Sequence, residues 1–137
     1  MGGMKGDDKA TRFFELTEHC FRFLEDEHAL KRVNKPTEGH YQSVEYSSPA
    51  VYVCVGYDMY SACVEISIRP SKSSNRRKYF DDILRDDGVK PNHTSFQAST
   101  LERLDEWIPK IAALFQQHAA KYLTVDQPPS HDQSLGF

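Results

Sequence analysis

An alternation of aliphatic side chains between residues 50 and 69 constrains the fold of this chain more than any other feature. Successive residues of a β-strand point to opposite faces of a sheet, so side chains at every second position share one face. The aliphatic residues that follow this rule are Val51, Val53, Val55, Ala62, Val64, Ile66 and Ile68. The two rows lie on the same face only if the connection holds an even number of residues, because a one-residue slip would expose one row to water. The pattern predicts a β-hairpin whose even loop falls within residues 58–61.

The opposite face of this hairpin carries two cysteines. Cys54 and Cys63 would stand directly opposite each other if the turn were a two-residue one at Asp58 and Met59. A cross-strand disulfide or a soft-metal site is one reading of that placement, and two small half-buried side chains are the simpler one. The third cysteine, Cys20, leaves an odd count without a CxxC pair, which favours reduced thiols in a cytosolic protein.

Two further strands are expected before the hairpin. Residues 30–33 form a short apolar and basic run, and residues 34–39 have turn chemistry throughout. Residues 41–46 then alternate weakly, as an edge strand does, and end before Ser48 and Pro49. Proline cannot donate to a strand ladder, so it closes this segment.

Three helices are expected around the strands. Residues 11–28 repeat apolar side chains at spacings of three and four, which predicts an amphipathic helix pressed against a sheet. Residues 78–85 predict a short helix, and residues 100–123 a long one. Ser99 and Glu102 have the spacing of a capping box at the start of the long helix. Pro109 lies inside it, so we expect a kink or a break there.

These elements define an α+β fold with a small antiparallel sheet of three or four strands. The N-terminal helix and a kinked C-terminal helix are expected to pack on its aliphatic face. A chain of 137 residues fits one domain with its own core. We assign residues 1–10 to a flexible N-terminus, 11–123 to the domain and 124–137 to a flexible tail.

Charge and hydropathy narrow the class of protein. The net charge of −3 makes the whole chain a poor match for a phosphate backbone, which argues against nucleic acid. The longest apolar run, residues 50–56, is too short to span a bilayer. The first eleven residues are charged and rich in glycine, unlike a signal peptide. We therefore expect a cytoplasmic protein without a membrane partner.

Motifs that carry chemistry are missing from the sequence. It contains no HExxH, no GxSxG, no Walker A segment and no GxGxxG. The six histidines and three cysteines do not have zinc-finger spacing. The sequence therefore predicts no catalytic residue, no metal ligand and no cofactor.

Two groups of residues suggest contact with another protein. Tyr52, Tyr57 and Tyr60 lie in or beside the hairpin, and tyrosine is enriched at protein interfaces. Coverage by one of the chain's own helices explains the same rings and is the simpler reading. Arg76 and Arg77 belong to a basic segment, residues 69–78, which suits a solvated loop, an acidic protein partner or, less well, a nucleic acid.

The order of these elements resembles that of a type of small, uncharacterised bacterial α+β protein, some of which are similar to immunity proteins of bacterial toxin systems. The resemblance covers about residues 11–123. It depends on core-packing segments: FRFLE at 21–25, VEY at 44–46, VCVGYD at 53–58, VEI at 64–66 and AALF at 112–115. Where such proteins end in an LLxGD-like segment, this chain has YLTVD at 122–126. The resemblance supplies no catalytic residues, and it implies a non-catalytic inhibitor of a partner toxin.

The expected function is therefore that of a protein-binding domain whose partner is a toxin or, as a homodimer, a second copy of the chain. A domain that binds a small molecule between sheet and helices is the first alternative. An enzyme whose residues converge only in three dimensions is the second.

Overall fold

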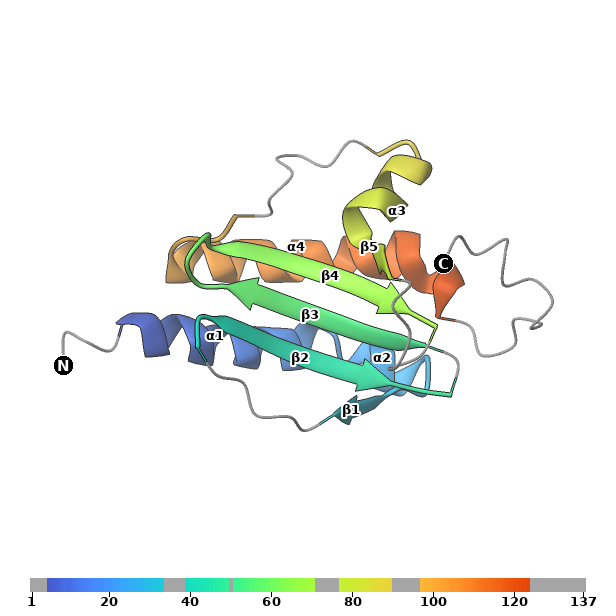
Figure 1. Ribbon diagram of the computed structural model, residues 1–137, viewed down its shortest axis with the longest axis horizontal. Coiled ribbons are helices and arrows are strands. Elements are labelled where there is room, and N and C mark those ends of the chain that lie inside the picture. Colours follow the sequence, from blue (N-terminus) through green and yellow to red (C-terminus); the bar gives the residue numbers. More distant parts are fainter. Residues whose placement is uncertain (1–4, 34–38, 50, 71–76, 90–96, 124–137) are drawn as a thin grey trace.

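The computed structural model describes residues 5–33, 39–49, 51–70, 77–89 and 97–123. They form two layers, a five-stranded antiparallel sheet and a layer of helices behind it (Figure 1). The strands are adjacent in chain order: β1 (Lys31–Val33), β2 (Tyr41–Ser47), β3 (Tyr52–Asp58), β4 (Cys63–Arg69) and β5 (Lys78–Tyr79). The helices are α1 (Lys5–Cys20), α2 (Phe23–Asp26), α3 (Phe80–Asp86), α4 (Leu101–Ala119) and the 3₁₀ turn η2 (Ala120–Tyr122). The α+β class is confirmed, with one strand more than the upper expectation.

The β3–β4 hairpin has the predicted facing. Val53 pairs with Ile68 and Val55 with Ile66, and these four side chains are buried on the helix side of the sheet. Asp58 pairs with Cys63, so the loop holds the four residues 59–62, an even number as the alternation requires. The expected bounds 58–61 are wrong by one residue, and Ala62 belongs to the loop rather than to the second strand. This register places Cys54 opposite Ser67 rather than opposite Cys63. The disulfide reading is therefore wrong, and all three cysteines are free thiols.

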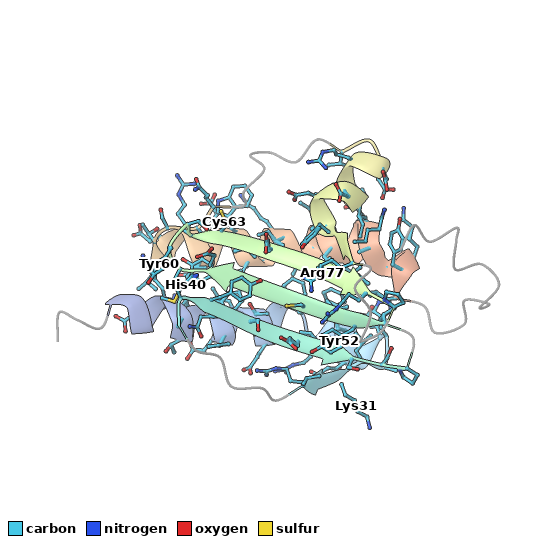
Figure 2. The ribbon with its side chains drawn as sticks, in the orientation of Figure 1. Lys31, His40, Tyr52, Tyr60, Cys63 and Arg77 are labelled. Carbon is cyan, nitrogen blue, oxygen red and sulfur yellow. The ribbon has the colours of Figure 1, made fainter. Side chains whose placement is uncertain are left out.

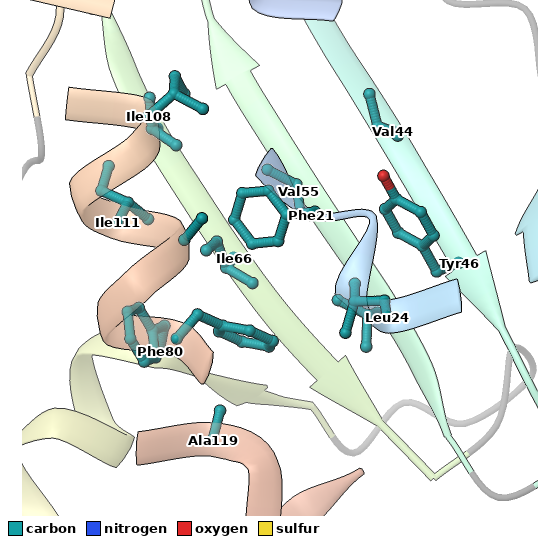
Figure 3. Close-up of a cluster of buried hydrophobic side chains, with 14 of the residues drawn as sticks. Phe21, Leu24, Val44, Tyr46, Val55, Ile66, Phe80, Ile108, Ile111 and Ala119 are labelled. Carbon is teal, nitrogen blue, oxygen red and sulfur yellow. The ribbon is translucent and has the colours of Figure 1, made fainter. Parts of the chain in front are cut away.

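The core lies between the sheet and the two long helices. Helices α1 and α4 run side by side behind the strands, and α4 brings Ile108 and Ile111 onto β4 (Figures 1 and 3). Phe21 and Phe115 meet at the centre of this layer, with ring centroids 5.9 Å apart. Each fully buried side chain of this size stabilises the fold by about 1.5–3 kcal/mol. The aromatic stripe predicted for the N-terminal helix is thus the surface that α1 presses against the sheet and α4.

Three elements outside the hairpin differ from the prediction. Strand β2 is an inner strand between β1 and β3, not an edge strand. The helix expected over residues 11–28 begins earlier, at Lys5, and is divided by a turn at Phe21 and Arg22 into α1 and α2. The start of the short helix expected at residue 78 is instead the two-residue strand β5, because Lys78 and Tyr79 pair with β4. For β2 and β5, long-range pairing overrides local propensity.

Helix α4 differs from the prediction in its N-terminal cap and in the effect of Pro109. Thr100, not Ser99, caps its N-terminus, since the Thr100 hydroxyl accepts a hydrogen bond from the Arg103 N–H at 3.0 Å. The helix continues through Pro109 without the expected break. Pro109 is exposed, so water can solvate the carbonyl group that its missing N–H leaves without a helical donor.

An acidic residue ties α3 to the end of α4. Asp87 accepts a hydrogen bond from the Lys121 ammonium at 2.6 Å, and its other oxygen lies 2.8 Å from His118 Nδ1. The hydrogen bond from Lys121, followed by that of His118, holds the pKa of the Asp87 carboxyl below its usual value. The carboxylate form of Asp87 is therefore favoured in the folded protein.

Both edges of the sheet are short. Strand β1 has three residues and β5 has two, whereas the three inner strands have seven each. Short edge strands offer few unpaired backbone groups to another sheet. None of the helices in the described ranges is long and apolar enough to cross a membrane.

Candidate protein-binding face

One face of the sheet faces away from the helix layer. Figure 1 shows α1, α2 and α4 behind the strands, while no labelled helix crosses the front of β2, β3 and β4. We call this front surface the open face. Because Val53, Val55 and Tyr57 point into the core, the alternate residues of β3 lie on the open face: Tyr52, Cys54, Gly56 and Asp58. The register then places the side chains that neighbour them on β2 and β4.

Tyr52 is held in place at the lower end of the open face (Figure 2). Its hydroxyl donates a hydrogen bond to Glu45 on β2, whose second oxygen accepts from the Ser43 hydroxyl at 3.2 Å. The Arg69 guanidinium lies over the Tyr52 ring, 4.7 Å from its centroid. Tyr52 is only 1% exposed and Glu45 only 5%. Burial, followed by the hydrogen bond to Glu45, raises the pKa of Tyr52, so its hydroxyl stays a donor.

A glycine on β3 makes room for a second tyrosine. The Tyr41 ring lies over Gly56, where an added Cβ would overlap the Tyr41 hydroxyl oxygen and ring. Glycine within a strand often marks such a close approach. Burial, reinforced by Cys54 and Glu65 and opposed by Arg77, raises the pKa of the Tyr41 hydroxyl. Tyr41 is still 38% exposed, so part of this residue is available at the surface.

Two arginines of the open face lie over tyrosine rings. Arg69 covers Tyr52, and Arg77, which is exposed, lies 6.0 Å from the ring centroid of Tyr79 on β5. Neither guanidinium forms an ion pair with any carboxylate of the described residues. Stacking of this kind holds the charged group in place while its N–H donors stay available. The open face therefore offers two fixed groups that suit carboxylates.

Among the described residues, the most exposed aromatic ring lies at the tip of the hairpin. Tyr60 is 84% exposed and stacks on His40, with ring centroids 4.1 Å apart and ring planes at 8°. The Asp58 carboxylate accepts a hydrogen bond from the Tyr60 backbone N–H at 2.9 Å, which fixes the turn. The Tyr60–His40 pair thus extends the open face beyond the end of β3 (Figure 2).

The predicted contact residues divide into four cases. Tyr60 and Arg77 are exposed, as a contact residue must be. Tyr52 faces outward but is enclosed by its neighbours. Tyr57 points into the core, where its hydroxyl donates to the Ala98 carbonyl at 2.7 Å, so it is removed from the candidate set. Arg76 lies outside the described residues.

Sequence reasoning missed part of this surface. The sequence pattern predicts Tyr79 within a helix, and it predicts Arg69 on the outer face of the hairpin and in the basic segment but not as a contact residue. The outward positions of Tyr41 and Glu45 follow from the alternation of β2 once Val44 and Tyr46 are known to be buried. The contact between Arg69 and Tyr52 requires the loop to lie at residues 59–62, since only that register puts the two residues opposite each other. The expected loop at 58–61 would have put Tyr52 opposite Ser67.

Within the described ranges, no group of three or more His, Cys, Asp or Glu residues is arranged to hold a metal ion. The groups gathered on the open face are hydroxyls, guanidinium groups, aromatic rings and the carboxylates of Glu45 and Asp58, which supply hydrogen bonds, charge and stacking area. Comparison of the chain with protein-family models, curated proteins and solved structures found no match.

Proposed function

We propose that this chain is a non-catalytic protein-binding domain, and that its open face binds a partner protein that presents carboxylates to Arg69 and Arg77. The pairing of arginine with tyrosine on that face carries the proposal. Tyrosine and arginine are enriched among the residues that contribute most binding energy at interfaces. Their fixed positions lower the entropy lost when a partner binds.

The size of the open face sets how much of an interface it can supply. The three seven-residue strands, at about 3.3 Å per residue and about 4.8 Å of width per strand, cover roughly 23 Å by 14 Å. That flat area is about two fifths of the roughly 800 Å² that each partner buries in a standard interface. The partner therefore also contacts the rim, where Tyr60 and His40 extend one end of the face.

The narrower role that we propose is inhibition of a toxin in a bacterial cytoplasm. This role rests on the sequence resemblance to immunity-type proteins. An inhibitor of that kind needs a complementary surface and no catalytic group of its own, which agrees with the composition of the open face.

The test compares two charge-reversed variants. Arg77→Glu changes an exposed arginine of the open face, and Arg103→Glu changes an exposed arginine of α4 on the helix layer. The purified variants and the wild-type chain are first compared by light scattering for self-association. They are then used to capture partners from source-cell lysate at physiological salt, and the dissociation constant of each purified partner is measured by calorimetry.

We expect one partner whose affinity falls about ten-fold or more with Arg77→Glu and is unchanged with Arg103→Glu. Equal affinities for the two variants would overturn the assignment of the open face. If light scattering shows that the wild-type chain is a homodimer and that Arg77→Glu dissociates it, the partner of the open face is a second copy of the chain. A captured toxin whose activity the chain does not reduce would overturn the inhibitor role alone.

A further inference from the structure

A charged pocket lies on the helix side of the sheet, away from the open face. It measures about 230 Å³ and is lined by Glu18 on α1, Arg22 in the α1–α2 turn, Glu25 on α2, Arg32 on β1 and Tyr46 on β2. Arg32 and Tyr46 are paired across the β1–β2 ladder, so strand pairing fixes their spacing. The turn that divides α1 from α2 brings Arg22 and Glu25 to the same opening.

Tyr46 forms the buried wall of this pocket. The residue is only 1% exposed, and its hydroxyl has no hydrogen-bond partner among the described residues. Figure 3 shows its ring beside Leu24 with the oxygen directed away from the strand. Burial raises the pKa of Tyr46, Arg32 opposes that shift and Glu25 adds to it, so the hydroxyl is a neutral donor. The Arg32 Nε beside it is a buried polar atom without a partner, and such an atom is costly unless a bound group or water satisfies it.

The charges around the pocket are only partly neutralised. Arg32 pairs with Glu18 through Nη1, but its buried Nε has no acceptor among the described residues. Arg22 and Glu25 make no ion pair, with each other or with any other described residue. One pocket therefore holds an unpaired cation, an unpaired anion and two donors that lack acceptors.

We propose that this pocket binds a small zwitterion, namely a free α-amino acid with a small side chain. Its carboxylate accepts hydrogen bonds from the Arg22 guanidinium, Arg32 Nε and the Tyr46 hydroxyl. Its ammonium group pairs with the Glu25 carboxylate. Arginine is suited to a carboxylate because its N–H groups match the two oxygens. The volume is below the roughly 300–1,000 Å³ of pockets for drug-sized ligands, which favours an amino acid with a small side chain.

The experiment titrates the full chain, labelled with ¹⁵N, with glycine, alanine and serine, and follows backbone amide signals by NMR. Acetate and methylamine each carry one of the two charges, and tryptophan tests the size limit. We expect glycine, alanine or serine to shift signals from residues around 18–32 with a Kd on the order of 1 mM or tighter. Acetate and methylamine are each expected to bind at least about ten-fold more weakly, since each lacks one charge-assisted contact.

Two variants and one control locate the site. Tyr46→Phe removes only the hydroxyl and is expected to weaken binding about five-fold, and Arg22→Gln about ten-fold. Tyr60→Phe removes an exposed hydroxyl at the far hairpin tip and is expected to leave the affinity unchanged. Absence of shifts with all three amino acids at about ten times that Kd overturns the proposal. Equal binding of acetate and glycine overturns the zwitterion and leaves a simple anion site. Binding that both pocket variants leave intact places the ligand elsewhere.

Discussion

Removing the hydroxyl of Tyr57 tests, by the loss of one oxygen atom, how the sheet is joined to the segment before α4. Tyr57 is fully buried, and its hydroxyl donates to the Ala98 carbonyl at 2.7 Å. Tyr57→Phe keeps the ring, which stacks on Phe13 with centroids 5.4 Å apart, so the apolar packing is preserved. What is lost is one buried hydrogen bond, and the Ala98 carbonyl is left without its donor.

The expected cost follows from these two losses. A buried hydrogen bond contributes about 0.5–1.5 kcal/mol net, and an unsatisfied buried acceptor costs about 1–3 kcal/mol, so we expect the free energy of unfolding to fall by about 1–2 kcal/mol. With an unfolding entropy of about 2.1 cal/mol/K per residue over 137 residues, the Tm falls by about 3–7 °C.

Urea denaturation followed by circular dichroism measures this loss, with Tyr60→Phe as the matched control. The Tyr60 side chain is 84% exposed, so removing its hydroxyl is expected to change the free energy of unfolding by less than about 0.3 kcal/mol. A Tyr57→Phe variant as stable as Tyr60→Phe would refute the inference that this hydrogen bond joins β3 to the segment before α4.

Two further predictions concern the helix ends. Thr100→Ala is expected to lower the free energy of unfolding by about 1 kcal/mol because it removes the cap on the Arg103 N–H, whereas Ser99→Ala is expected to leave it nearly unchanged. Urea denaturation of both variants measures the difference, and the reverse order would restore Ser99 as the cap. The pKa of Asp87 is lowered in the folded state, so its contribution is present above the unfolded pKa of about 4 and is lost as pH falls through the folded value. Asp87→Asn is therefore expected to be less stable than wild type near neutral pH and to lose less stability on acidification. Thermal unfolding of both proteins between neutral and strongly acidic pH measures this difference. Parallel pH profiles for the two proteins would contradict the assignment of the stabilisation to Asp87.

The elements that the sequence predicted correctly are those set by local periodicity. The facing of the β3–β4 hairpin, the even loop and the amphipathic long helices follow from the positions of apolar residues alone. Period-two and period-3.6 patterns identify which side of an element is buried, whichever element covers it. The same alternation also predicts that Tyr57 points into the core, because Tyr57 continues the row of Val51, Val53 and Val55.

Strand order and strand length depend on partners that are distant in the sequence. The weak alternation of β2 is typical of an edge strand, yet β1 pairs with its free side and makes it an inner strand. Lys78 and Tyr79 have no strand pattern of their own, and they become β5 because β4 offers an unpaired edge beside them. Such pairings are long-range, so local propensity does not reveal them.

The candidate binding surface and the pocket likewise combine residues from several elements. Sequence alternation by itself determined which residues of β3 face away from the core. Only the tertiary structure decided that Tyr52 is enclosed by Glu45 and Arg69, because both contacts depend on the registers of neighbouring strands. It also decided that Arg22 and Tyr46 meet at one pocket, since the turn between α1 and α2 and the β1–β2 pairing must both form first. Periodicity identifies the face that a residue occupies, whereas its neighbours across that face come from chain segments that only folding brings together.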